Sequence, residues 1–357
     1  MLRRRFSFDL VPLIVSACLL SVSCKKNDAT PEQQSRGKYE NGFFIVNEGW
    51  FGHENGSVNF YAYGADTLQT RVFQVENPGK DLGVTTEYAT IHNGKLYLVS
   101  KQGAFVAADA YTLKETNRLD KLPADGRAFL GLDENTALLS TANGIYLFNL
   151  KTFTPGSTLS TVTGQVGDMA KANGSIYISQ SSGVSILDAN SYALQKKYAG
   201  LIQGFTVAKD GAIWTTNSKG LVRFNTQTLD TTQVILPFTS YGSWFAWNAL
   251  SPVASSKEAA LFMAKVASYG AGGNTIYKYT EGDINSVQNP FITVPNGQSF
   301  YGAALRYDAK KNQLVVTTVL TGYQENHLLF YDATTGTLLK DVTYNGYYFP
   351  ALPIFNK

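Results

Sequence analysis

A four-residue signal recurs along this chain at nearly constant spacing. In each of its five copies, a short apolar segment ends in Asp or Asn, and Ser or Thr follows three positions later. The copies are Asp109–Thr112, Asn149–Thr152, Asp188–Ser191, Asn225–Thr228 and Asp332–Thr335. The first four begin 40, 39 and 37 residues apart. A repeat of this length is typical of a solenoid or of a fold assembled from blades, and it constrains every other interpretation of the sequence.

The residues around each signal predict a β-hairpin. An alternating strand such as 145–148 precedes the signal, and a more polar strand such as 192–198 follows it. The Asp or Asn side chain can accept hydrogen bonds from backbone N–H groups about two residues on, which closes a tight turn. Upstream, the pairs at 93–94, 173–174 and 210–211 are Asn-Gly or Asp-Gly, which supply the positive φ of hairpin turns. One more apolar segment precedes each pair, so a repeat is expected to hold four antiparallel strands, as a propeller blade does.

Seven such units fill the chain. The 107 residues between Asn225 and Asp332 leave room for one extra unit, whose degenerate hairpin is expected at 276–283. Residues 57–67 supply another unit before the first clear copy. The sequence therefore predicts an all-β fold, namely a seven-bladed β-propeller of four-stranded antiparallel blades.

The C-terminal segment 346–352 predicts how the ring closes. It resembles the expected inner strands 243–250 and 299–305, yet no unit follows it. We expect it to pair with residues 43–46 of the N-terminal blade, which would leave the ring without an open edge. Two prolines near its end lack a backbone donor and argue mildly against this pairing.

The composition suits this fold and limits the partners. Only 16% of the 357 residues are charged and 13% are aromatic, which fits an all-β domain with a large core. Without residues 1–23, which carry three arginines and one aspartate, the formal net charge of +3 falls by two to +1. No basic excess then remains to attract nucleic acid, so none is expected as a partner.

The N-terminus has the features of an export signal. Three arginines at 3–5 form a positive region, and the apolar stretch 10–22 that follows is too short to span a membrane. Small residues, then Cys24 and a polar tract, resemble a bacterial lipoprotein processing site. We expect Cys24 to carry the lipid, with Cys18 as the alternative.

These features divide the chain into three parts and predict its location. We expect a lipoprotein signal peptide at 1–23, a flexible tether at 24–39 and the propeller at 40–357. Both cysteines precede residue 25, so the mature domain has no disulfide and must rely on its core. The protein is expected to be an outer-membrane lipoprotein exposed at the cell surface and held to the membrane by its lipid anchor.

The search for catalytic residues finds no set. The three histidines, His53, His92 and His327, are far apart in the sequence and suit solvated loops better than a metal site. No cysteine of the mature domain could act as a nucleophile. Lone acids in loops, such as Glu48 and Glu87, are weak signals. We therefore expect a protein that is not an enzyme and that holds no metal and no cofactor.

Aromatic residues give the stronger signal for binding. Near the starts of the expected inner strands they recur from blade to blade, where they either fill the space between blades or stack on a large flat ligand. In the loops they stand beside Gly, Ser and Asn, which is the composition of adaptable recognition surfaces. The candidate ligand-binding residues are Trp50, Phe51, Tyr88, Phe129, Phe205, Tyr241, Trp244, Tyr269, Tyr301, Tyr323 and Tyr348.

Two end motifs carry a resemblance to a known family. Residues 47–49 (Asn-Glu-Gly) and 349–355, with the repeated turns, resemble the YncE-like seven-bladed surface lipoproteins of Bacteroidetes over residues 40–357. Within that family, the chain is similar to members that bind cobalamin above the outer-membrane vitamin B12 transporter. The resemblance implies a non-enzymatic protein that captures a corrinoid on one propeller face and passes it to a TonB-dependent transporter. Cobalamin has apolar faces and amide arms, which suit aromatic rings and Asn, Gln or backbone groups.

Two other functions stay open from the sequence alone. Exposed Trp and Tyr rings stack on sugars as well as on corrinoids, so a surface module for a glycan or a protein fits the same loops. An enzyme, such as a propeller lyase or a quinone-dependent dehydrogenase, would need a cluster of His and acidic residues, and the scarcity of histidine argues against it.

Overall fold

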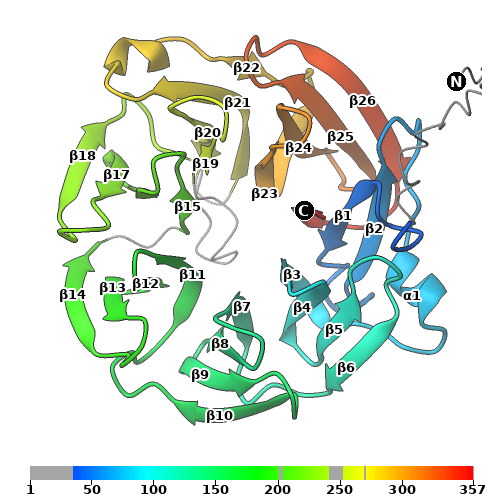
Figure 1. Ribbon diagram of the computed structural model, residues 1–357. Helices are drawn as coiled ribbons and strands as arrows, with labels where there is room; N and C mark the ends of the chain where they lie inside the picture. Colours follow the sequence, from blue (N-terminus) through cyan, green and yellow to red (C-terminus); the bar gives the residue numbers. More distant parts are fainter. Residues whose placement is uncertain (1–34, 201–203, 241–251, 269–270, 357) are drawn as a thin grey trace, which may run out of the picture. The chain divides into compact units, whose positions relative to one another are not determined.

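The computed structural model describes residues 35–200, 204–240, 252–268 and 271–356. The segment Arg36–Lys357 forms one compact unit. Within this unit, seven antiparallel sheets lie around a common axis, and Figure 1 looks along that axis. This arrangement confirms the predicted seven-bladed β-propeller.

Six of the blades contain four consecutive strands each, ordered from the axis outward (Figure 1). The second and third blades hold β3 (Val84–His92), β4 (Lys95–Gln102), β5 (Phe105–Asp109), β6 (Glu115–Leu119), β7 (Gly126–Gly131), β8 (Thr136–Thr141), β9 (Gly144–Asn149) and β10 (Thr154–Thr158). The fourth and fifth hold β11 (Val166–Ala172), β12 (Ser175–Gln180), β13 (Gly183–Asp188), β14 (Leu194–Ala199), β15 (Thr206–Val207), β16 (Ile213–Asn217), β17 (Gly220–Phe224) and β18 (Thr231–Ile235). The last two hold β19 (Val253–Ala254), β20 (Ala260–Ser268), β21 (Ala271–Thr280), β22 (Ile292–Thr293), β23 (Gln298–Asp308), β24 (Gln313–Leu320), β25 (Glu325–Asp332) and β26 (Leu338–Asn345), with the 3-10 helix η1 (Ile284–Val287) between β21 and β22.

The first blade joins the two ends of the chain. Its strands, from the axis outward, are β27 (Pro350–Phe355), β1 (Gly42–Asn47) and β2 (Ser57–Ala62). Phe43 lies opposite Phe355 and Val46 lies opposite Leu352, so the predicted closure by the C-terminal strand is confirmed. The paired strand starts a few residues later than predicted, at Pro350. β27 lies at the edge of its sheet and pairs only with β1, a position in which proline is tolerated.

This blade departs from the predicted four strands. In place of a fourth strand, a single bridge joins Phe60 to Gln69, with N···O distances of 2.8 and 2.9 Å. The chain then enters the short helix α1 (Val72–Glu76), in which Val72 and Phe73 are buried. A helix therefore covers the side of β2 on which a fourth strand was expected.

The closing strand passes close to the neighbouring blade at Gly302 on β23. Gly302 has a φ of +58°, which a side chain disfavours. A Cβ at this position would also collide with the carbonyl oxygens of Pro350 and Ala351. Glycine at this point is therefore what allows β27 to lie against β23.

The repeated signal forms the same turn wherever it occurs. Oδ1 of Asp109 accepts hydrogen bonds from the N–H of Tyr111 at 2.9 Å, the N–H of Thr112 at 2.8 Å and the Thr112 hydroxyl at 3.0 Å. The side-chain oxygen of the first residue accepts the two backbone bonds in the other four copies too. The fifth residue of each turn has a positive φ; these residues are Leu113, Phe153, Tyr192, Leu229 and Gly336. At Leu113 the side chain is fully buried, so apolar packing offsets the strained backbone.

Removing the first side chain of one turn should destabilise the propeller. We expect Asp109→Ala to lower the free energy of unfolding by about 1–2 kcal/mol, because three donors lose their acceptor. Asp109→Asn is the matched control, since Asn149 and Asn225 fill this place in other blades. Urea unfolding of the three proteins provides the measurement. An equal loss in the Asn variant would show that the charge, and not the hydrogen bonds, stabilises the turn.

Residues 36–39, predicted to belong to the tether, are part of the compact unit. Tyr39 is fully buried in the largest apolar cluster, which joins blades one, two, six and seven. Its hydroxyl donates to Glu76 at 2.8 Å, and its N–H donates to the Tyr111 carbonyl at 2.9 Å. Residues 36–39 are therefore packed on the propeller, although the prediction assigned them to the tether.

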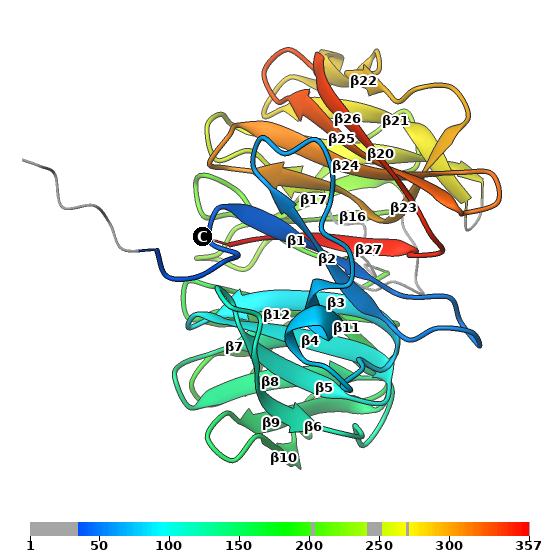
Figure 2. The ribbon, with the colours of Figure 1, turned by 90° about the vertical axis from the view of Figure 1, so that its right-hand side faces the viewer.

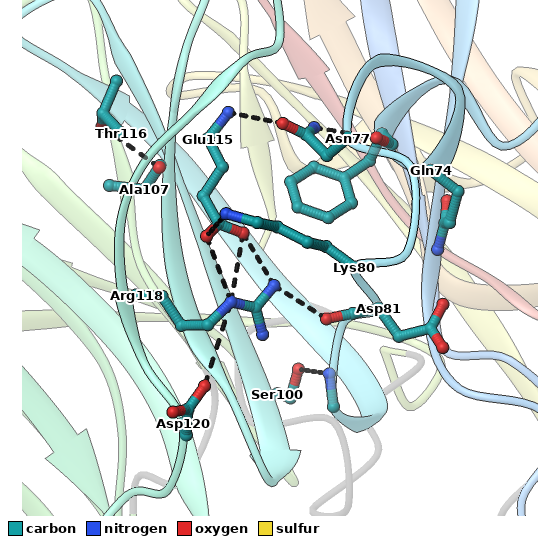
Figure 3. Close-up of polar contacts among 12 residues, drawn as sticks. Gln74, Asn77, Lys80, Asp81, Ser100, Ala107, Glu115, Thr116, Arg118 and Asp120 are labelled. Atoms are coloured by element: carbon teal, nitrogen blue, oxygen red, sulfur yellow. Dashed lines mark hydrogen bonds and ion pairs between the residues drawn. The ribbon is translucent and has the colours of Figure 1, made fainter.

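A group of charged residues fixes the connection between the first two blades. Figure 3 shows Glu115 on β6 accepting bonds from Lys80 Nζ and from Arg118 Nη2, each at 2.7 Å. Arg118 also donates to the Asp81 carbonyl at 2.9 Å. Burial raises the pKa of the Glu115 carboxyl, but the two cations outweigh this effect and hold the pKa below its usual value.

Along the described part of the chain, no helix has the length and apolar character needed to cross a membrane.

Candidate functional site

The direction of the inner strands separates two ends of the ring. Each blade has one strand nearest the axis; these inner strands are β3, β7, β11, β15, β19, β23 and β27. Each inner strand is paired with an antiparallel neighbour, which is β1 in the case of β27. The loops 47–56, 321–324 and 346–349 lie at the end where the inner strands begin, because Asn47 is paired with Pro350 and Gln298 with Leu320. We call this end the loop face. In the side view of Figure 2, the loop after β1 extends from one side of the ring and the C-terminus lies on the other.

Stacked rings hold Trp50 on the loop face. Its ring stacks on that of Tyr347 at a centroid distance of 4.4 Å and on that of His53 at 3.9 Å. Two further bonds fix this loop to the chain before β27: the Glu48 N–H donates to the Phe349 carbonyl at 2.9 Å and the Gly49 N–H to the Tyr348 carbonyl at 3.1 Å. The two end motifs of the sequence therefore meet here, although 300 residues separate Gly49 from Phe349.

A second group of rings continues this surface. Tyr323 stacks on Phe349 at 5.5 Å, and both contact Tyr301, at 6.0 and 5.5 Å. The Tyr301 hydroxyl donates to Glu48 Oε2 at 3.1 Å, which links this group to the loop of Trp50. Tyr323 and Phe349 have φ values of +58° and +52°, which are unusual for bulky residues. Strained backbone of this kind is concentrated at binding sites, where the surrounding structure holds it in place.

The exposed rings of the described chain gather at this end. Among large apolar side chains that are exposed in the described residues, the aromatic ones are Trp50 at 37%, Phe51 at 69% and Tyr323 at 47%. All three belong to loops of the loop face, and contacts on both sides hold Trp50 and Tyr323. The surface is therefore both exposed and preorganised.

Two acids lie beneath these rings. The Thr86 N–H donates to the Glu48 carbonyl at 3.4 Å, which brings Glu48 beside Glu87 on β3. Burial raises the pKa of Glu48 to about 7, and the bond from Tyr301 and the charge of Lys101 offset this only in part. Burial and then the neighbouring Glu48 charge raise the pKa of Glu87 to about 8. Near neutral pH, the pair therefore tends to keep a proton.

The acid pair predicts a pH dependence of stability. The folded pKa values lie above the usual 4.5, so the pair contributes full stability below pH 4.5 and loses it as the pH rises through about 8. We expect the free energy of unfolding to fall between pH 5 and pH 8 on account of this pair, by up to about 6 kcal/mol at 1.36 kcal/mol for each pKa unit. Glu87→Gln should flatten that slope, whereas Glu134→Gln in an exposed loop should keep it. Denaturant titrations at several pH values measure both; equal slopes in the two variants would contradict the assignment.

The predicted binding residues that the structure describes do not all lie together. Trp50, Phe51, Tyr301 and Tyr323 lie on the loop face, as described above. Tyr348 instead packs inward against Tyr344 at 5.7 Å, and its neighbour Tyr347 takes the place beside Trp50. The residues Tyr241, Trp244, Tyr269 and Cys24, and the alternative Cys18, lie outside the described residues.

The remaining three predicted residues line a central cavity between the inner strands. Tyr88, Phe129 and Phe205 border a space of about 540 Å³ to which every blade contributes. Phe129 is 1% exposed and stacks on Tyr97 at 4.3 Å, so it also fills the space between blades. The Tyr88 hydroxyl donates to the Phe129 carbonyl at 3.0 Å, which fixes the ring. Whether the three contact a ligand stays a prediction.

Sequence reasoning missed the charged residues of this cavity. Asp168 on β11 is buried, and its Oδ2 accepts the Phe205 N–H at 2.9 Å. Arg306 on β23 lines the same space and donates to the Leu305 carbonyl at 2.9 Å. Burial raises the pKa of Asp168 to about 6 and lowers that of Arg306 to about 10, and the attraction between the two opposes both shifts. No local motif marks either residue, since 138 positions separate them.

The arrangement of the described residues offers stacking and charge. No cluster of three or more His, Cys, Asp or Glu in the described ranges could hold a metal ion. Of the histidines, His92 contacts the Asp133 carbonyl at 2.8 Å, and His327 contacts Asp341 at 2.8 Å, so each already has a structural partner.

The fold and this surface define the chain as a seven-bladed β-propeller with an exposed aromatic face. Comparison with family models shows the family of the chain: residues 41–356 match the family described as "Domain of unknown function (DUF5074)", and the chain belongs to that family. No curated protein matches it in sequence.

Solved structures show similarity in fold alone. A candidate 6-phosphogluconolactonase from Bacteroides uniformis is 12% identical with a TM-score of 0.63, over 88% of this chain and 99% of that one. The extracellular domain of a one-component system from B. thetaiotaomicron is 13% identical with a TM-score of 0.52, over 84% of this chain and 34% of that one. The dihydro-heme d1 dehydrogenase NirN is 11% identical with a TM-score of 0.54, over 87% and 75%.

Proposed function

We propose that this protein is a non-enzymatic binding protein that captures a large ligand on its loop face. The observation that carries the proposal is the gathering of Trp50, Phe51 and Tyr323, the exposed aromatic side chains of the described chain, on that face. Exposed rings cost free energy in water, and rings already held by stacking lose little further freedom when a ligand covers them.

The ligand that we propose is a corrinoid such as cobalamin. Its support is the resemblance to the cobalamin-binding lipoprotein BtuG, carried by residues 47–49 and 349–355, which meet at the loop face. The rings would cover an apolar face of the corrin. Glu48 and the backbone groups of the loops would pair with its amides.

The cellular setting of the proposal follows from the N-terminus. A lipid on Cys24 would hold the propeller at the outer membrane, facing the cell surface. The bound corrinoid would then pass to a TonB-dependent outer-membrane transporter, and the protein itself would carry out no reaction. Protease treatment of intact cells would test whether the protein is exposed at the cell surface. Incorporation of radioactive palmitate would test separately whether it carries a lipid.

Calorimetric titration of residues 36–357 with cyanocobalamin tests the ligand. We expect one-to-one binding with a dissociation constant below about 1 μM, which corresponds to about 8 kcal/mol. Bound ligand should also raise the melting temperature. The absence of both heat and thermal stabilisation would reject the corrinoid.

A second candidate ligand is a glycan, which the acids of the loop face favour. Glu48 lies beside the exposed rings, and carboxylates bind sugar hydroxyls while rings stack on sugar faces. A glycan array probed with the same domain distinguishes the two ligands. Binding to an oligosaccharide, with no heat from cyanocobalamin, would retain the loop face as the site and replace the ligand.

A further inference from the structure

The central cavity has a wall that comes from every blade. Its lining residues belong to, or directly precede, the inner strands β3, β7, β11, β15, β19, β23 and β27, which surround the axis in Figure 1. Its volume of about 540 Å³ falls in the range of small-molecule sites. Because the wall surrounds the space on all sides, a compact cyclic body fits it better than an extended chain.

Apolar side chains of this wall remain exposed. Val207 lines the cavity and is 51% exposed, although it lies on β15, the inner strand of its blade. Ile91, Leu130 and Ile354 line the same space and are half-buried. Each Å² of apolar surface that a ligand covers contributes about 25 cal/mol to binding. The wall therefore favours an occupant with an apolar surface.

The two opposite charges in the wall offset each other. Oδ2 of Asp168 accepts the Phe205 N–H at 2.9 Å, and the Asp168 carboxylate and the Arg306 guanidinium attract each other. Lys171 also lines the cavity but is exposed, so solvent and salt screen its charge. A charged ligand would lose its own hydration and would disturb the pair of Asp168 and Arg306. An uncharged ligand avoids both costs.

We propose that the central cavity binds a small, uncharged cyclic molecule, whose apolar body lies against Val207, Ile91 and Ile354. The Tyr88 ring borders the same space, and its hydroxyl donates to the Phe129 carbonyl at 3.0 Å. This bond fixes the ring before a ligand arrives, so little side-chain freedom is lost on binding. The site is independent of the ligand proposed for the loop face, because none of the rings of that face lines the cavity.

Two fluorescent probes that differ in charge test the proposal on the protein comprising residues 36–357. The uncharged N-phenyl-1-naphthylamine should bind at a single site. The anion 8-anilinonaphthalene-1-sulfonate should bind at least tenfold more weakly, because its sulfonate would lose water. Fluorescence titration gives both affinities. Equal affinity for the two probes, tighter binding of the anion, several equivalent sites, or no binding of the uncharged probe would overturn the proposal.

A charge placed in the wall tests where the uncharged probe binds. Val207→Asp should weaken its binding at least tenfold, and the exposure of Val207 favours a folded variant. Ile235→Asp is the matched control: Ile235 is 59% exposed on β18, the outer strand of the same blade, so its replacement should leave the affinity unchanged. Thermal unfolding verifies that each variant is folded. An unchanged affinity in Val207→Asp, or an equal loss in Ile235→Asp, would contradict the site.

Two further variants keep the test valid if Val207→Asp does not fold. Val207→Trp reduces the space without adding a charge, and it should also weaken binding of the uncharged probe. Phe51→Ala tests whether the probe binds to the rings of the loop face instead. Full binding in Val207→Trp, or loss of binding in Phe51→Ala, would place the probe outside the cavity and overturn the proposal.

Discussion

Replacing both Trp50 and Phe51 by alanine should lower the affinity for cyanocobalamin at least tenfold while the propeller stays folded. A tenfold loss corresponds to about 1.4 kcal/mol, and aromatic residues at the centre of a binding surface often contribute more than this. The two side chains are 37% and 69% exposed, so their removal leaves little cavity in the core. Calorimetry gives the affinity, and thermal unfolding gives the stability of the variant.

The matched control is Leu338→Ala. Leu338 is 42% exposed on the outer strand β26, so it is an apolar side chain of similar exposure away from the loop face. Its replacement should leave the affinity unchanged. If both variants bind cyanocobalamin as tightly as the native protein does, the protein binds the corrinoid at a site other than the loop face.

Removal of the closing strand should have the largest effect on folding. A chain that ends at Asn345 lacks β27, so β1 keeps only β2 as a ladder partner and becomes the exposed inner edge of its blade. Ala351 and Leu352 are 3% and 2% exposed, and the apolar burial of Leu352 alone is worth about 2 kcal/mol. We expect the truncated protein to aggregate or to melt at least 10 °C below the native protein, as followed by circular dichroism.

Two further experiments, an added peptide and a point substitution, distinguish loss of the strand from a general effect of truncation. A synthetic peptide of residues 346–357, added to the truncated chain, should recover part of the lost melting temperature, whereas a scrambled peptide should not. Gly302→Ala in the full-length chain should also destabilise, because its Cβ would meet the backbone of β27. A truncated chain that melts like the native protein would show that the other six blades are stable without closure.

Local chemistry explains why so much of the fold was predictable from the sequence. The turn at Asp109 requires only residues within five positions, so its signal can be read directly from the chain. The closing strand was predictable because 346–352 resembles an inner strand without a blade of its own. The absence of a fourth strand in the first blade was not predictable, because the bridge from Phe60 to Gln69 and the helix α1 depend on packing against β2.

The candidate sites were predictable only in part, because contacts across the ring leave no local trace. The loop around Trp50 was recognisable from its own composition, but the choice between Tyr347 and Tyr348 depends on which ring meets Trp50. Asp168 and Arg306 have no neighbours in sequence that suggest a common cavity. Burial of Tyr39 was also hidden, since the residues before it are polar throughout.

The loop face forms late in synthesis, because Glu48 and Gly49 bond to the chain just before β27. The loop 47–56 is synthesised about 300 residues before the segment 346–349 that holds it in place. A nascent chain therefore carries no complete loop face until β27 has emerged and has paired with β1. If the loop face binds the proposed ligand, a copy that is terminated before β27 would not compete for that ligand.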